Sequence, residues 1–198
     1  MTRTVRYHHG DLRAALVERA TDVVASGGVD VLSMRELARD LGVSHAAPSR
    51  HFADRQALLD AVAVNGFDRL RVALDLAPGT AGASFEARLG IHAACYVRFA
   101  LRNAPLLAVM FAAKHRREAP AEIRESAERA FDAPLQLLQQ AQQHGEVVGR
   151  SVDEISTAIL ATMHGFATLV AGGLLAEQGW ERSLAETMTL LVEGLRPR

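Results

Sequence analysis

The sequence predicts an all-α protein of about nine helices. Every long periodic stretch of the 198 residues carries apolar side chains at helical spacing. No run alternates between apolar and polar residues as a half-buried strand would. Hydrophobic residues make up 49% of the chain and charged residues 23%, which is typical of a folded globular protein and not of a disordered one.

Charge and cysteine content exclude several classes of protein. A formal net charge of −1 excludes a uniformly basic nucleic-acid binder but leaves room for a local basic face. Because Cys95 is the single cysteine, an internal disulfide and a cysteine-based metal cluster are both excluded. The opening MTRTVRYHHGDLR contains no apolar stretch and no run approaches ~18 apolar residues, so we expect no signal peptide and no membrane span. The expected location is the cytoplasm.

Two helices are expected before residue 42. The first carries an apolar stripe from Leu12 to Val24 and ends at Gly27-Gly28. The second begins at Ser33, whose side chain can accept the backbone N–H of Glu36 in a capping box. Gly42 ends this second helix.

A third short helix is expected at roughly residues 45–52, followed by a long helix over residues 54–77. Pro48 removes one backbone N–H, so the short helix could begin one or two residues later. The stretch 78–84, PGTAGAS, is the best linker candidate. The predicted domains are therefore an N-terminal domain at 1–53, a connecting helix at 54–77 and a C-terminal domain at 78–198.

The remaining chain is again helical in pattern. A stripe from Phe85 to Ala100 is followed by a break at Asn103-Ala104-Pro105 and a shorter helix. Residues 120–144 form the next helical stretch, and Pro134 inside it should kink or split the helix.

Two further capping boxes are expected to open the last two helices. Ser151 and Glu154 form the first, and Ser183 and Glu186 form the second.

Residues 33–52 have the length of a helix-turn-helix and its start and stop signals, with Gly42 at the start of the turn. In this motif the second helix enters the DNA major groove while the first helix braces it. The predicted recognition helix, Ser44 to His51, is short, polar and free of large aliphatic residues, unlike a buried structural helix. Helix pairs with a glycine turn also occur in proteins that never touch DNA, so an interaction module without DNA binding stays open.

Three arginines near the motif could meet DNA. Arg3 and Arg6 belong to an N-terminal arm that could reach a minor groove or a phosphate. Arg55 stands at the start of the next helix, where the helix N-terminus also favours a phosphate. For each of them a solvated surface charge is an equally good interpretation.

Residues 7–67 resemble the DNA-binding domain of TetR/AcrR-type transcriptional regulators. The resemblance is carried by Ser33-x-x-Glu36-Leu37-Ala38, Leu41-Gly42-Val43-Ser44, His51-Phe52 and Arg55-x-x-Leu58-Leu59. In the second half, Met163-His164-Gly165-Phe166 resembles the Trp-His-Gly signature of one subgroup, with Met in place of Trp.

The resemblance implies an all-helical homodimer that binds double-stranded DNA at a palindromic operator and a small molecule in its C-terminal body. The residues expected to contact DNA are Arg3, Arg6, Tyr7, His8, Ser33, Arg35, Ser44, His45, Ala46, Ala47, Ser49, Arg50, His51 and Arg55. Among them, His45, Ala46 and Ala47 would face base edges. Most family members have an aliphatic residue and then Tyr where this chain has Pro48-Ser49, so one usual phosphate contact is missing.

The second half supplies candidates for an effector pocket, because such pockets are mostly apolar with a few polar anchors. They are His92, Cys95, Tyr96, Phe99, Met110, Phe111, Phe131, Leu135, Met163, His164 and Phe166. Core packing is the alternative for each of them. No cofactor is expected, and the effector itself is an unidentified small apolar or amphipathic molecule. The eight histidines suggest metal sensing as an alternative function, but no HxxxH or cysteine-rich spacing supports a metal site.

The last two helices are the expected dimer surface, as part of a four-helix bundle across a two-fold axis. The residues expected there are Gly172, Gly173, Leu184, Met188, Leu191 and Leu195. The alternative is that these helices close the core of their own subunit.

The sequence therefore favours a homodimeric, ligand-responsive transcriptional regulator acting as a repressor. The main alternative is a helical small-molecule-binding or interaction protein without sequence-specific DNA binding, and a helical enzyme with a site around His92, His115 and His164 is a weaker one. The chain has no paired carboxylates in a recognisable motif, no nucleophile elbow and no phosphate loop, so we expect no catalysis.

Overall fold

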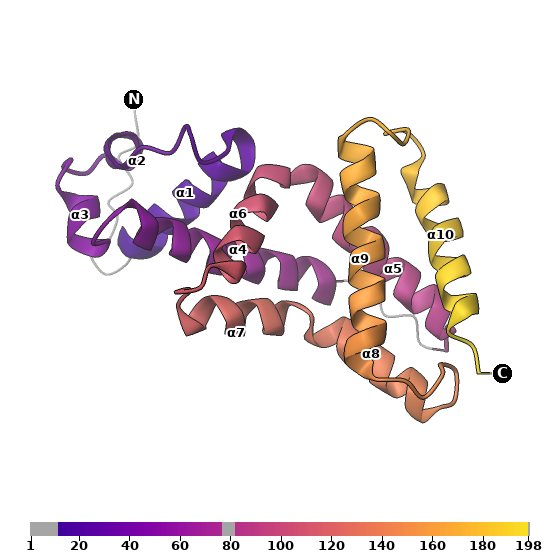
Figure 1. Ribbon diagram of the computed structural model, residues 1–198. Coiled ribbons are helices and arrows are strands. Elements are labelled where there is room, and N and C mark those ends of the chain that lie inside the picture. The colour runs from indigo at the N-terminus through magenta and orange to yellow at the C-terminus, as the bar shows by residue number, and fades with distance from the viewer. Residues whose placement is uncertain (1–11, 77–81, 198) are drawn as a thin grey trace. The chain divides into compact units, whose positions relative to one another are not determined.

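The computed structural model describes residues 12–76 and 82–197, and this part of the chain is entirely helical (Figure 1). The described residues form ten helices: α1 (Leu12–Gly27), α2 (Met34–Asp40), α3 (Ala47–His51), α4 (Arg55–Asp75), α5 (Phe85–Arg102), α6 (Ala104–His115), α7 (Ala121–Ala130), α8 (Asp132–Gln143), α9 (Val152–Ala171) and α10 (Trp180–Gly194). The predicted all-α class is confirmed. The tenth helix arises because the stretch 120–144 splits at Phe131, three residues before Pro134.

The described residues form two compact units. The head unit contains the described chain up to Phe67 together with Pro105–Ser126, and the body unit contains Asp68–Ala104 and the chain from Ala127 onward. The sequence placed a division near residues 78–84, of which 77–81 lie outside the described residues. Helix α6 and most of α7, expected in the C-terminal domain, instead pack with the N-terminal helices.

Close packing of α6 on α4 explains this difference. Gly66 of α4 has no side chain, and a Cβ placed there would lie 2.7 Å from Sδ of Met110. The rings of Phe67 and Phe111 meet edge to face with their centroids 6.2 Å apart. Such packing depends on tertiary structure, so no local sequence pattern announces it.

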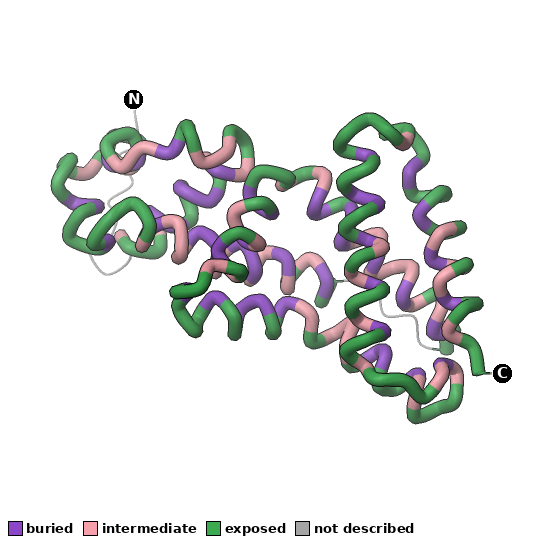
Figure 2. The backbone as a smooth tube through the Cα atoms, viewed as in Figure 1, coloured by how far each residue is buried: buried purple, intermediate pink, exposed green. Residues whose placement is uncertain are grey.

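The first three helices pack against one another around a shared apolar core. Leu16, Ala20 and Val24 of α1 have no exposed surface, and Leu37 and Ala38 of α2 are equally buried. Figure 2 shows buried segments along the inner side of α1 and exposed backbone around α3. The predicted apolar brace beneath the helix-turn-helix is therefore present.

Two local signals in the helix-turn-helix act as predicted. Oγ of Ser33 accepts the backbone N–H of Glu36 at 3.4 Å and so caps α2. Gly42 adopts φ +65°, a left-handed conformation that other residues rarely tolerate, and this lets the chain turn toward α3. Helix α3 begins at Ala47 with Pro48 in its first turn, two residues later than residue 45.

In the body unit, α5 packs against α8, α9 and α10 (Figure 1). Leu89, Ala93 and Tyr96 line the buried side of α5. The N–H of Phe85 donates to the Glu146 carboxylate at 3.0 Å, which ties the start of α5 to the loop after α8.

Neither predicted capping box forms in the body unit. Ser151 is the N-cap of α9, but its side chain makes no capping hydrogen bond. Ser183 lies inside α10, which begins at Trp180 after Gly179 in a left-handed conformation at φ +78°. The indole of Trp180 is buried, so its packing favours an additional turn of helix before Ser183.

Among the described helices, α9 alone is long and apolar enough to cross a membrane by length and composition. One third of its apolar window is buried in the body unit. A core helix of a soluble protein meets the same criteria, so this helix is weak evidence for a membrane span.

Candidate nucleic-acid interface and effector site

One face of helix α3 packs against the neighbouring helices, and the opposite face is exposed to solvent. Ala47 and Pro48 are buried against α1 and α2, whereas Ser49, Arg50 and His51 are exposed. The turn before α3 exposes Ser44, His45 and Ala46. The expectation that Ala47 faces base edges is wrong, because its side chain helps to anchor the helix. The remaining polar side chains form an outward face that is free to meet a ligand.

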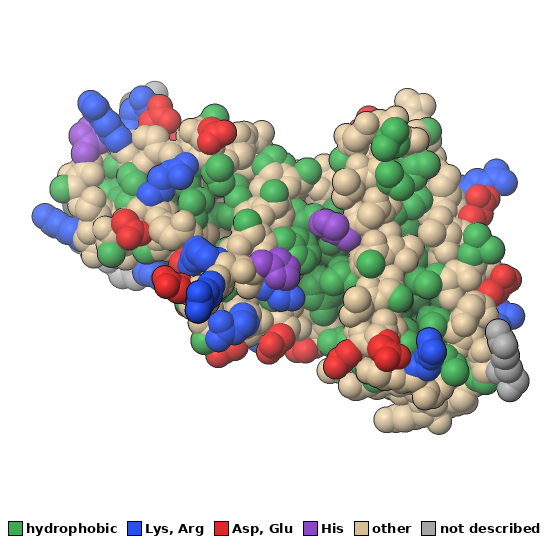
Figure 3. Space-filling view, in the orientation of Figure 1, with side chains coloured by type: hydrophobic (Ala, Val, Ile, Leu, Met, Phe, Trp, Pro, Cys, Tyr) green, Lys and Arg blue, Asp and Glu red, His purple; other side chains and the backbone are tan. Residues whose placement is uncertain are grey.

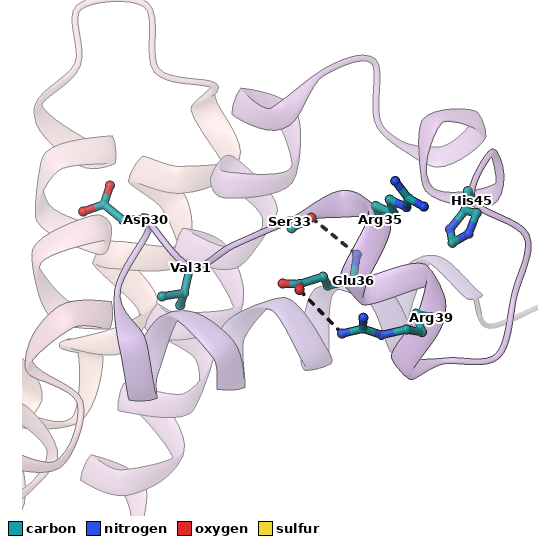
Figure 4. A pocket seen from close by; sticks show the side chains of 7 residues that line it. All are labelled: Asp30, Val31, Ser33, Arg35, Glu36, Arg39 and His45. Carbon is teal, nitrogen blue, oxygen red and sulfur yellow. Dashed lines mark hydrogen bonds and ion pairs between the residues drawn. The ribbon is translucent and has the colours of Figure 1, made fainter.

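A hollow of about 780 Å³ lies beside α2 (Figure 4). Its lining consists of Asp30, Val31, Ser33, Arg35, Glu36, Arg39 and His45. Arg39 forms an ion pair with Glu36 at 3.5 Å, on the α2 side of the hollow. Arg35 and His45 lie toward its α3 end, away from Asp30. That end therefore presents hydrogen-bond donors to an acidic ligand.

Basic side chains gather at the end of the head unit that holds α2 and α3, as the blue and purple atoms in Figure 3 show. Arg35, Arg39, His45, Arg50 and His51 supply the cationic and imidazole groups that the structure describes in these elements. Net charge near zero therefore conceals a local excess of donors.

Arg55 and Asp54 shape the start of α4. The Arg55 guanidinium donates to the backbone carbonyl of Val29. The carboxylate of Asp54 accepts the backbone N–H of Ala57 at 2.8 Å and caps the helix. Arg55 thus links α4 to the loop after α1, a role that its sequence position did not indicate.

Two arginines of this region were not among the predicted site residues. Arg39 lines the hollow beside α2, and the Arg13 guanidinium lies over the Phe52 ring, 5.4 Å from its centroid. Arg39 follows Arg35 by one helical turn, a spacing that could have identified it. Arg13 shows no comparable signal. The predicted contacts Arg3, Arg6, Tyr7 and His8 lie outside the described residues.

The predicted effector residues divide between the two units. Tyr96, Phe131 and His164 come together in the body unit, where the Tyr96 ring centroid is 6.3 Å from that of Phe131 and 6.5 Å from that of His164. Met163 and Phe166 are buried nearby on α9, and Leu135 is half-buried on α8. Met110 and Phe111 belong to the head unit and pack on α4, so their place in an effector pocket is corrected to core packing.

Helix α5 carries two polar side chains that are buried or partly buried, those of Tyr96 and His92. The Tyr96 hydroxyl lies 2.9 Å from Nδ1 of His164. Burial raises the pKa of Tyr96 well above its ordinary value, so the phenol stays protonated in this contact. Burial also lowers the pKa of His92, and the negative charge of Asp75, which acts to raise that pKa, only partly offsets this effect. Within the described part of the chain, Nδ1 of His92 is buried and has no hydrogen-bond partner.

Cys95 and Phe99 lie in a different place from the Tyr96 cluster. They line a hollow of about 210 Å³ together with Ala73, Arg98, Arg102 and Asn103. Arg98 and Arg102 were not among the predicted pocket residues, because charged side chains on a helix are usually solvated.

The predicted dimer stripe on α10 is corrected in part. Leu184 and Met188 are each 1% exposed and pack inside the body unit, so they close the core of their own subunit. Leu191 and Leu195 are half-buried. Gly172 and Gly173 end α9, and φ +73° at Gly173 accounts for that glycine. The exposed apolar side chains here are Leu169, Leu174 and Leu190.

No described group of three or more His, Cys, Asp or Glu side chains is arranged to hold a metal ion.

Two family models match the chain. Residues 16–62 match the model described as bacterial regulatory proteins, tetR family. Residues 91–195, more than half of the chain, match the model of a tetracyclin repressor-like C-terminal domain. This second match includes the Met163-His164-Gly165-Phe166 segment.

Solved structures share the fold. A protein of unknown function from Rhodococcus sp. RHA1 is 41% identical, with 98% of this chain and 100% of that chain covered and a TM-score of 0.87. A TetR family transcription regulator from Marinobacter aquaeolei VT8 is 19% identical, with 94% and 96% covered and a TM-score of 0.72. The TetR family transcriptional regulator PfmR from Thermus thermophilus is 19% identical, with 92% and 96% covered and a TM-score of 0.66.

None of the curated proteins matches the chain. The two family models together cover helices of both units, and the match to the Rhodococcus protein extends over nearly the whole length. Regulators of this kind are transcription factors rather than enzymes, which rules out the helical enzyme as an alternative. The chain belongs to the tetR family of bacterial regulatory proteins.

Proposed function

We propose that the protein binds a palindromic DNA operator as a homodimer and is a repressor that a small molecule releases. The observation that carries this proposal is the exposed polar face of α3 on a buried base of Ala47 and Pro48. A helix anchored in this way can enter a major groove about 12 Å wide without losing its support.

Side chains around α3 divide by chemistry into two kinds of DNA contact. His45, Ser49 and Arg50 can donate to base edges, and Arg35 with Ser33 can donate to the phosphates beside the groove. The ion pair between Arg39 and Glu36 keeps Arg39 at the edge of the same hollow. Phosphate contacts would fix the register of the head, and base contacts would select the sequence.

Dimerisation would place two heads on one operator. Leu169 of α9, Leu174 after it and Leu190 of α10 are 42%, 77% and 71% exposed. Large exposed leucines are costly in water unless another surface covers them. A second copy of the chain, packed on these helices about a two-fold axis, would cover them.

Effector binding belongs to the body unit in this proposal. The unpartnered Nδ1 of His92 and the buried hydroxyl of Tyr96 would provide polar anchors, with the exposed His164 at the outer end of its hydrogen bond to Tyr96. A ligand that prefers one body conformation would shift the population of heads away from the spacing that DNA requires. Cytoplasmic location follows from this role as a regulator of genes.

Fluorescence anisotropy with DNA from upstream of the protein's own gene tests the proposal. We expect that DNA to bind at least about 10³-fold more tightly than a scrambled duplex at physiological salt. The Arg50→Ala variant should bind the same DNA at least about tenfold more weakly, because a base or phosphate contact is lost. Arg129→Ala, which removes an exposed arginine from the last turn of α7, is the matched control and should bind normally.

Equal affinity for the upstream and the scrambled duplex at every salt concentration would contradict the proposal. It would favour an interaction module without sequence-specific DNA binding. Equal affinities of the Arg50→Ala and Arg129→Ala variants for the upstream DNA would show that Arg50 of α3 does not contact DNA.

A further inference from the structure

A hollow of about 210 Å³ at the C-terminal end of α5 has the composition of a binding site for a small anion with an apolar part. Its lining consists of Ala73, Cys95, Arg98, Phe99, Arg102 and Asn103, all within the body unit. It is separate from the Tyr96–His164 pair, which lies on another side of α5.

Two arginines one helical turn apart supply the positive charge. Arg98 already has two partners. Its guanidinium lies over the Trp180 ring, 5.8 Å from the ring centroid, and one of its nitrogens is 4.0 Å from the Glu181 carboxylate. Arg102 has no ion-pair partner among the residues that the structure describes. A carboxylate in the hollow could therefore bind Arg102 through paired N–H···O bonds and draw on Arg98 as a second donor.

The rest of the lining is suited to an apolar group. Phe99 is 8% exposed, and Ala73 and Cys95 complete a surface without charge. The Asn103 side-chain amide already donates to the carbonyl of Phe99 at 2.9 Å, which fixes that side chain at the rim. The lining therefore combines two guanidinium groups with apolar side chains.

The volume limits the size of the ligand. A hollow of about 210 Å³ is below the range of about 300–1,000 Å³ typical of drug-sized ligands. An acid with one short chain or one ring suits this space.

We propose that this hollow binds a small carboxylic acid, with its carboxylate on Arg102 and Arg98 and its apolar part against Phe99 and Ala73. A role for this acid as the effector would rest on the proposed function, whereas its binding does not.

The chain contains a built-in reporter for this site. Trp180 is the only tryptophan, and Arg98 lies against its ring. A carboxylate that attracts the Arg98 guanidinium changes the environment of the indole. Tryptophan fluorescence of the full-length protein therefore reports on the hollow through Arg98, with no DNA present.

The test is a fluorescence titration with benzoate and, separately, with the uncharged amide benzamide. We expect benzoate to give a saturable change in Trp180 emission and benzamide to give none. Arg102→Ala should weaken benzoate binding at least tenfold. Arg102→Lys should fall between that variant and the wild type, because it keeps the charge and loses the paired donors.

Arg129→Ala provides the control, because Arg129 is likewise an exposed arginine in the last turn of a helix. If Arg102 only stabilises the end of α5, its variants will shift the thermal midpoint and leave the benzoate response as in Arg129→Ala. That result would overturn the proposal. So would equal responses to benzoate and benzamide, or the absence of saturation with benzoate.

The two proposals fail separately. Loss of the benzoate response with intact operator binding overturns the anion site alone, because the anisotropy experiment contains no acid. A benzoate response in a protein that ignores its upstream DNA supports the anion site and overturns the proposed function.

Discussion

Gly66 is the residue on which the contact between α4 and α6 depends most closely. A Cβ at this position would lie 2.7 Å from Sδ and 2.8 Å from Cγ of Met110, closer than real side chains approach. Met110 itself is fully buried. Absence of a side chain at residue 66 therefore allows α6 to join the head unit.

Replacing Gly66 with Ala should lower the free energy of unfolding by about 1–3 kcal/mol, because Met110 must move within a close-packed core. Gly90→Ala on α5 is the matched control, since nothing lies within 4 Å of a Cβ there. That change should stabilise the protein by up to about 1 kcal/mol through helix propensity. Urea denaturation followed by circular dichroism measures both. Equal effects of the two substitutions would contradict the packing account.

Helices α4 and α6 are also joined by an ion pair with two hydrogen bonds. Nη1 and Nη2 of Arg116 donate to Oδ1 and Oδ2 of Asp60 at 2.9 and 2.7 Å, and Gln56 donates to Oδ1 at 2.8 Å. Burial raises the pKa of Asp60, but these hydrogen bonds and the charge of Arg116 outweigh it and hold the pKa below 3.8. The pair fixes the end of α6 against the first half of α4.

Asp60→Asn should cost about 1–2 kcal/mol of stability at pH 7, because it weakens a charge-assisted pair and leaves Arg116 without its carboxylate. The folded-state pKa is depressed, so the stabilisation is fully present above the ordinary value of 3.8 and is lost as pH falls toward the folded value. Urea midpoints of wild type and variant at pH 7, 5 and 4 should therefore converge only at the acid end. A gap that does not change with pH would mean that the Asp60 charge contributes nothing.

At the level of elements, local signals predicted what local chemistry decides. Ser33 as a cap, Gly42 as a turn and Pro48 in the first turn of α3 all act on their immediate neighbours. The predictions that were wrong concern features that depend on packing between residues far apart in the sequence. The buried Trp180 extends α10 past the predicted cap, and contacts of Gly66 draw α6 into the head unit.

The candidate site shows the same contrast. The exposure of Ser44, His45, Ser49, Arg50 and His51 follows from their polarity, whereas the inward positions of Ala47 and Pro48 do not. In the body unit, which leucines of α10 face inward depends on how α10 meets α5. Leu184 and Met188 therefore could not be separated from Leu190 by apolar character alone.

In the proposed function, two copies of the chain bind one operator. The exposed leucines of α9, its following turn and α10 are the surface proposed for the second copy. Each head carries one α3, and a palindrome presents one half-site to each.

Leu190→Glu should convert the dimer to a monomer, because a buried unpaired carboxylate at an apolar contact is strongly unfavourable. Sedimentation equilibrium measures the mass, and operator affinity should fall at least tenfold at the same concentration. Leu76→Glu changes a leucine of similar exposure outside these helices and should leave the mass unchanged. A Leu190→Glu variant that keeps the wild-type mass would remove this surface from the dimer.

In the proposed function, paired α3 helices enter successive major grooves on one face of the duplex, about 34 Å apart. The most direct measurement compares the affinity for the operator with that for the same operator carrying five extra base pairs between its half-sites. Half a helical turn moves one half-site to the opposite face, so the account predicts an affinity close to that for scrambled DNA. Unchanged affinity for the lengthened operator would contradict it.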